Sequence, residues 1–153
     1  MKKSMTILIA LAVLAAGGAA WAADTNTLTV RASVAPTCRF STPTSLLDFG
    51  LLVPGSGLDV TGSATTNFWC TSGVITDAIT AGNGLHYSGT SRQVMGPGGS
   101  LIPYSLTFAA GGGANVGPSA PRTLTLSGGI LYAGYSGAPG GDYFDTVVLS
   151  ITP

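Results

Sequence analysis

The sequence predicts an all-β domain built as a sandwich of short strands. Gly, Thr, Ser and Val are plentiful, whereas the chain contains no Glu and its two lysines are Lys2 and Lys3. Residue types that favour helices are therefore scarce. Apolar and β-branched segments recur at roughly 8- to 12-residue spacing with turn residues between them, which is typical of a β-sandwich. No heptads, helical periodicity or internal repeats are present, so we expect one domain.

The first residues, 1–22, have the features of a secretory signal peptide. A basic start at Lys2 and Lys3 is followed by an apolar run over residues 5–16 and by small residues around an expected cleavage site after Ala22. The run is shorter than the roughly 20 apolar residues that a membrane span needs, and no later segment reaches that length. A retained anchor is the alternative; we expect export and no transmembrane segment in the mature chain.

The number and type of charged and catalytic residues argue against several classes of function. After the signal, the chain has four arginines and six aspartates, without a basic patch for nucleic acid or anionic lipid. Its one histidine is His86, and there is no nucleophile elbow or phosphate loop. Asp142 and Asp145 are the best-placed carboxylate pair, but their places in a turn and at a strand start have an ordinary capping explanation. We expect neither an enzyme nor a cofactor or metal site.

The first predicted strand covers residues 25–34 and ends before Pro36. Its alternation is regular, and such alternation puts successive side chains on opposite faces. One face carries Thr27, Thr29, Arg31 and Ser33; the apolar face carries Leu28, Val30, Ala32 and Val34. A patterned strand at a terminus, where chains are normally frayed, predicts a groove that receives it.

Two cysteines follow the signal, Cys38 and Cys70. In an exported protein they are most simply one disulfide, which contributes roughly 3 to 4 kcal/mol in the chain-entropy model. A metal site is the alternative, but it would need further ligands and only His86 is available.

The remaining strands follow from apolar alternation between turn signals such as Pro54-Gly55 and Gly82-Asn83-Gly84. They are predicted at residues 36–40, 46–50, 65–71, 74–81, 85–87, 92–95, 101–108, 122–126, 130–135 and 143–152. In the last of them, one face is shared by Tyr143, Val147, Leu149 and Ile151.

The predicted strands at the two ends of the chain complement each other, because each lacks a partner that the other can provide. The sequence stops at Pro153, directly after an apolar strand, and an uncovered strand edge favours aggregation. The first strand has no obvious neighbour. We infer that one end supplies the strand that the other lacks, in the manner of β-augmentation between copies. Folding back within one chain would satisfy the same edge and stays open.

Short motifs throughout the chain point to a known family. They are Cys38, Leu47-Asp48-Phe49-Gly50, Cys70-Thr71-Ser72-Gly73, Arg92 with Met95, Leu101-Ile102-Pro103-Tyr104-Ser105-Leu106 and Gly141-Asp142-Tyr143-Phe144-Asp145-Thr146-Val147. Together they resemble the spore coat protein U domain, which is shared by the pilus subunits of archaic chaperone–usher systems. The resemblance covers essentially the whole mature chain, and the last motif is its most specific part.

The resemblance implies an incomplete immunoglobulin-like β-sandwich that is completed by a donated strand. It divides the chain into a signal peptide (1–22), a donor-strand extension (23–35) and the sandwich domain (36–153). It implies that Cys38 and Cys70 pair and that the extension inserts Leu28, Val30, Ala32 and Val34. The acceptor-groove candidates are Phe40, Phe49, Tyr143, Val147, Leu149 and Ile151.

The function that the resemblance implies is that of a structural subunit in a surface pilus for adhesion or biofilm formation. Its partners would be a periplasmic chaperone, an outer-membrane usher and other pilus subunits. The alternative is a secreted or fibre-tip adhesin module that binds a carbohydrate or surface, for which Trp69 and Tyr135 are the best candidates for exposed aromatics.

Overall fold

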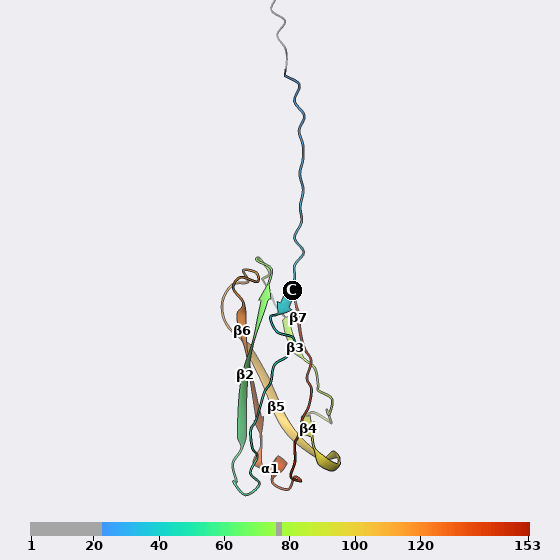
Figure 1. Cartoon of the computed structure of the whole chain (residues 1–153), viewed down its shortest axis with the longest axis vertical. Coiled ribbons are helices and arrows are strands. Elements are labelled where there is room, and N and C mark those ends of the chain that lie inside the picture. The colour runs from blue at the N-terminus through green and yellow to red at the C-terminus, as the bar shows by residue number, and fades with distance from the viewer. Residues whose placement is uncertain (1–22, 76–77) are drawn as a thin grey trace, which may run out of the picture. The chain divides into compact units, whose positions relative to one another are not determined.

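The computed structural model describes residues 23–75 and 78–153, so the expected signal peptide at 1–22 lies outside the described residues. The chain divides into an N-terminal part that ends at Ser33 and a folded unit over Val34–Pro153. The described residues of the N-terminal part have neither strand nor helix, and the folded unit contains all of the assigned elements (Figure 1).

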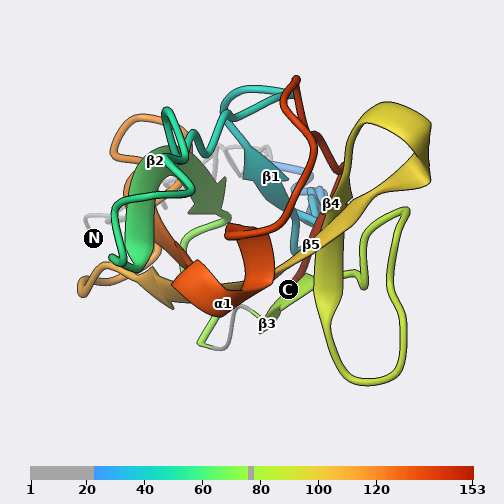
Figure 2. The same ribbon diagram turned by 90° about the horizontal axis from the view of Figure 1, so that it is seen from below.

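The folded unit is built from two antiparallel sheets (Figure 2). The first has five strands in the order β1-β2-β6-β5-β4, and the second has two, β3 and β7. The strands are β1 (Cys38–Phe40), β2 (Val60–Cys70), β3 (Ala78–Ala81), β4 (Arg92–Met95), β5 (Leu101–Ala110), β6 (Arg122–Ile130) and β7 (Leu149–Thr152).

Within residues 23–75 and 78–153, helical structure is confined to two short pieces, η1 (Pro97–Gly99) and α1 (Tyr132–Tyr135). The structure is therefore nearly all-β with an open sheet, which confirms the predicted fold class of an incomplete immunoglobulin-like sandwich.

The long pair β2 and β6 forms the middle of the domain, and two apolar clusters are built on it. One cluster consists of Phe68, Cys70, Leu124 and Leu126. The other consists of Val94, Ile102, Ile130 and Tyr135. Every other apolar side chain that packs against them is only half-buried, so the core is thinly covered.

Four predicted strands are corrected by the structure, at residues 25–34, 46–50, 85–87 and 130–135. Residues 25–34 alternate as expected but are assigned no strand, because alternation does not by itself supply a backbone partner. Residues 46–50 are irregular. Residues 130–135 are not a strand: Ile130 ends β6 and α1 follows, with the Tyr135 ring turned into the second cluster.

Other boundaries also move. The predicted strand at 143–152 is regular only in β7, and Phe144 forms a single bridge to Met95. Residues 85–87 belong to a turn region, and β3 begins at Ala78. Turn geometry and pairing partners set these limits, and neither can be deduced from local alternation.

Candidate functional site

The first component of the candidate site is the outer edge of β7. Residues Ala78 to Ala81 pair with Thr152 to Leu149, and Gly82 N–H donates to the Val148 carbonyl at 2.8 Å in the same register. Hydrogen-bonded pairs alternate along an antiparallel ladder, so Val148, Ser150 and Thr152 direct their backbone groups to β3. The N–H and C=O groups of Leu149 and Ile151 consequently face the other edge, where the described part of the chain places no strand.

The second component is the outer edge of β1. Ser41 N–H donates to the Asn67 carbonyl and Thr71 N–H to the Thr37 carbonyl, each at 2.8 Å. The same alternation then directs the backbone groups of Cys38 and Phe40 away from β2. Both strands thus have free backbone groups at their outer edges.

These two edges lie close together: β1 and β7 have Cα atoms within 8 Å of each other. We call this place the β1–β7 seam. The side chains of Phe40, Leu149 and Ile151 border it and pack against the first cluster while staying half-buried. The seam therefore combines unpaired backbone with incompletely covered apolar side chains, which is the chemistry that an added strand requires.

The other predicted acceptor residues lie elsewhere or are already packed. Phe49 lies over β2 and β6, with its ring 6.1 Å from that of Tyr104, and packs against the second cluster. Tyr143 packs against the same cluster, and its hydroxyl donates to the Pro139 carbonyl at 2.9 Å. Val147 is half-buried and precedes β7. Their role in strand acceptance stays a prediction.

The predicted donor residues are exposed. Leu28, Val30 and Val34 expose 82%, 81% and 81% of their surface, and Ala32 is exposed as well. Large apolar side chains that alternate in solvent are costly to leave there, because burying each contributes about 1.5 to 3 kcal/mol. The role of these side chains as inserted residues stays a prediction.

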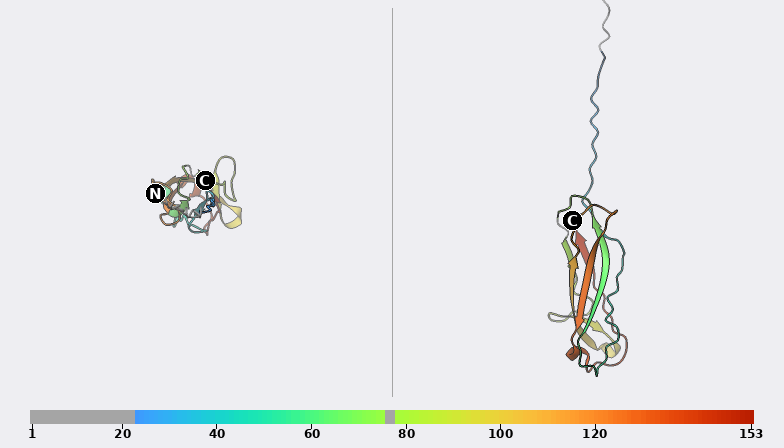
Figure 3. Two further views of the ribbon diagram at one scale, coloured as in Figure 1. Left: turned by 90° about the horizontal axis from the view of Figure 1, so that it is seen from above. Right: turned by 90° about the vertical axis from the view of Figure 1, so that its left-hand side faces the viewer.

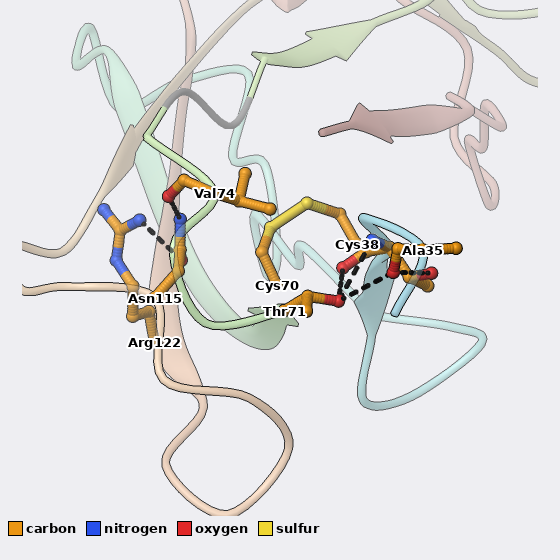
Figure 4. Close-up of a disulfide and its surroundings, with 8 residues drawn as sticks. Ala35, Cys38, Cys70, Thr71, Val74, Asn115 and Arg122 are labelled. Carbon is orange, nitrogen blue, oxygen red and sulfur yellow. Dashed lines mark hydrogen bonds between the residues drawn. A yellow bond between two sulfur atoms is a disulfide. The ribbon is translucent and has the colours of Figure 1, made fainter. Parts of the chain in front are cut away.

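The predicted disulfide is confirmed. Cys38 and Cys70 are bonded and also face each other across β1 and β2 (Figure 4). The adjacent Thr71 strengthens this attachment: its hydroxyl accepts the Thr37 N–H at 3.1 Å and donates to the Thr37 carbonyl at 3.2 Å. The start of β1 is therefore held firmly where the extension leaves the domain. Thr71 lies in one of the motifs recognised in the sequence, but its bonds to Thr37 were not predicted, because they join residues 34 positions apart.

A polar cluster joins the two sheets at a second place. The Arg92 guanidinium on β4 donates to the carbonyls of Ala81 (3.2 Å) and Gly82 (2.8 Å) at the end of β3. The Tyr104 hydroxyl on β5 donates to Asp145 Oδ2 at 2.7 Å, and Asp145 Oδ1 accepts the Leu85 N–H at 2.8 Å. We call Arg92, Tyr104 and Asp145 the polar clasp; it fastens the second sheet to the first.

The surroundings of Tyr104 in the polar clasp also change the pKa of its phenol. Burial raises the pKa of the Tyr104 phenol well above its ordinary value, and the hydrogen bond to Asp145 and its negative charge add to the increase, whereas Arg92 opposes it. The motifs around Arg92 and Asp145 were recognised in the sequence, but the hydrogen bonds of Arg92 to Gly82 and of Tyr104 to Asp145 were not, because they join separate segments of the chain.

In residues 23–75 and 78–153, no three His, Cys, Asp or Glu side chains are grouped so as to hold a metal. No helix among these residues is both long and apolar enough to traverse a bilayer. The expectation of an exposed Tyr135 was wrong: the side chain is 1% exposed and donates to the Leu58 carbonyl at 2.7 Å, while Trp69 is half-buried.

Fold and site together define a class of protein: an immunoglobulin-like β-domain whose two sheets meet without backbone pairing at one seam and whose N-terminal segment is patterned as a strand. Residues 24–150 match the family model of the Spore Coat Protein U domain, and the chain belongs to this family. It is a family of exported surface fimbrial subunits that are assembled by chaperone–usher systems and have a structural role. No curated protein gave a significant match.

Proposed function

We propose that this protein is a pilus subunit that polymerises when its extension, residues 23–35, inserts into the β1–β7 seam of another copy. The observation that carries the proposal is the outer edge of β7, where unpaired backbone groups coincide with the half-buried side chains of Leu149 and Ile151. Leu28, Val30, Ala32 and Val34 would cover these side chains while the extension completes the backbone ladder.

Insertion requires the seam to widen. A strand that pairs on both sides separates its neighbours by twice the interstrand distance, about 9.6 Å, whereas β1 and β7 approach within 8 Å. The β1–β7 contact seen in the single chain is thus a closed form of the acceptor. A periplasmic chaperone that holds the seam open, and an outer-membrane usher that exchanges the chaperone for the next extension, would provide the route to the cell surface.

The bond between subunits would be long-lived. Burying the side chains of Leu28, Val30 and Val34 contributes about 1.5 to 3 kcal/mol each before ordering entropy is subtracted. The added ladder must also break as a unit, which makes dissociation slow and gives kinetic stability. Such a fibre suits adhesion or biofilm formation, since it holds without a covalent link.

The test compares the oxidised chain that begins at Ala35 with the same chain plus a peptide of residues 24–35. We expect the truncated chain to aggregate or melt without cooperativity, and the peptide to restore a cooperative transition followed by circular dichroism. A peptide with Leu28 and Val30 replaced by Ser is the matched control. A truncated chain that melts cooperatively and ignores the peptide would contradict the proposal.

A further inference from the structure

The end of the domain where the extension leaves it carries an apolar hollow of about 680 Å³. Its lining includes Val34, Pro36, Val74, Ile75 and Pro153. Ile75 is 93% exposed and Val34 is 81% exposed. We call this surface the hollow end.

The opposite end of the domain exposes a set of leucines. β2 begins and β6 finishes there, and the figures place α1 and the adjoining loops at the end of the domain remote from Pro153 (Figures 1 and 3). Leu51, Leu58 and Leu131 are 86%, 68% and 66% exposed. We call this surface the leucine end.

The leucine end is firmly built. The Tyr135 hydroxyl donates to the Leu58 carbonyl at 2.7 Å, and Asp59 Oδ1 accepts the Tyr132 N–H at 2.7 Å. The Tyr132 hydroxyl also donates to the Pro54 carbonyl. Because α1 anchors the loop before β2 in this way, the leucines are presented at a fixed surface rather than on a free loop.

Chain connectivity determines what meets the hollow end. Val34 is both the last of the four side chains proposed to insert and part of the hollow's lining, so no linker separates the donated strand from this surface. A copy that holds the extension in its seam must therefore lie beside the hollow end of the donor. The occupant of this surface is a second copy of the chain.

Strand direction determines which end of that copy arrives. β1 starts at the hollow end and β7 finishes there, so a strand inserted between them is antiparallel to one and parallel to the other. Antiparallel pairing is the more stable per residue and β7 is the longer of the two strands, so the extension is placed antiparallel to β7 and parallel to β1. An extension antiparallel to β7 starts near the acceptor's Pro153 and runs toward its leucine end, where Val34 would emerge.

We propose that the hollow end of each subunit packs on the leucine end of the next, in addition to the inserted strand. The proposal rests on the proposed function. The contact joins two different surfaces, and a contact of this kind repeats without closing and produces a filament. It also buries Ile75 and the leucines, which are otherwise among the most exposed large apolar side chains of the described residues.

Cross-linking in the assembled full-length chain tests this contact. In the double variant Ile75→Cys with Leu131→Cys, we expect oxidation to join neighbouring subunits, seen as a ladder on denaturing, non-reducing gels after heating. The matched control is Ile75→Cys with Leu85→Cys, which replaces a leucine that is 69% exposed on another loop. Proximity should make cross-linking at least about tenfold faster than in the control.

A charge pair provides a second readout that needs no added cysteine. We expect Leu131→Arg to make fibres more flexible in electron micrographs, and Ile75→Asp in the same chain to restore their stiffness. If polymers form but neither cross-linking above the control nor charge rescue occurs, the end-to-end contact is wrong and strand exchange stands. If the wild-type chain forms no polymer, the proposed function itself fails.

Discussion

Gly62 and Gly128 face each other across β2 and β6, and their missing side chains make room for Phe49. A Cβ at Gly128 would lie 2.8 Å from Phe49 Cζ and 2.9 Å from the Ser105 carbonyl oxygen, which belongs to the backbone and cannot easily move. These glycines therefore act by packing, and they position the Phe49 segment beside the second cluster.

We expect Gly128→Ala to destabilise the domain by about 1 to 3 kcal/mol, as is usual when a well-packed site is overfilled. Thermal unfolding followed by circular dichroism measures the effect. Gly112→Ala is the control, since a Cβ at Gly112 meets no atom within 4 Å. Equal melting temperatures for the two variants would show that Phe49 does not depend on the glycine pair.

The polar clasp makes the stability of the folded domain depend on pH, and this contribution falls at high pH. The pKa of Tyr104 is raised in the folded state by burial and by Asp145, while a free tyrosine ionises at about pH 10. The stabilisation from the neutral phenol is therefore complete below about pH 10 and is lost as the pH rises further, because only the unfolded chain releases that proton readily.

We expect Tyr104→Phe to cost about 1 kcal/mol at neutral pH through the lost hydrogen bond, and to lessen the decline in stability above about pH 10. Denaturant unfolding at a series of pH values measures both effects. Tyr87→Phe is the control, because Tyr87 is 41% exposed. If Tyr104→Phe and the wild type lose stability in parallel at high pH, the clasp does not control the alkaline limit.

At the scale of secondary-structure elements, the alternation of apolar and polar residues indicated which face of a strand is buried. It did not indicate which strands pair with each other. It identified β5, β6 and the inward side chains Leu149 and Ile151, because the faces of these strands differ in polarity. It mistook residues 130–135 for a strand, since the aromatic residues of α1 suit either structure. The polar clasp and the seam depend on contacts between distant segments, which no local pattern contains.

The extension permits a matched pair of substitutions. Val30 is on its apolar face and Thr29 on the other. We expect Val30→Asp to abolish strand exchange, because a buried carboxylate without a partner costs several kcal/mol, and Thr29→Asp to leave it nearly unchanged. Peptides of residues 24–35 with each substitution, competing with the wild-type peptide for the truncated domain, measure the difference. If both substitutions weaken the peptide's competition equally, the peptide binds through its overall charge or composition and not through its apolar face.

At the scale of the whole molecule, the donor segment and the acceptor seam of the proposed strand exchange belong to separate parts of the chain. Most of the extension belongs to the N-terminal part that ends at Ser33, and the seam is formed entirely within the folded unit. A subunit can therefore lose the ability to donate a strand and keep the ability to accept one. In a linear polymer this separation has a measurable consequence, since a subunit without an extension can still accept a strand but cannot donate one.

We expect the chain that begins at Ala35 to terminate assembly when it is mixed with intact subunits. Each truncated copy occupies one extension and offers none, so one truncated copy per ten intact ones limits fibres to a mean of about ten subunits. Fibre length in electron micrographs should fall in proportion to the added fraction. The same chain with Leu149→Asp and Ile151→Asp is the control, because its acceptor side is lost and fibre length should not change. Fibres of constant length at every ratio of the unsubstituted truncated chain would show that growth does not proceed through the β1–β7 seam.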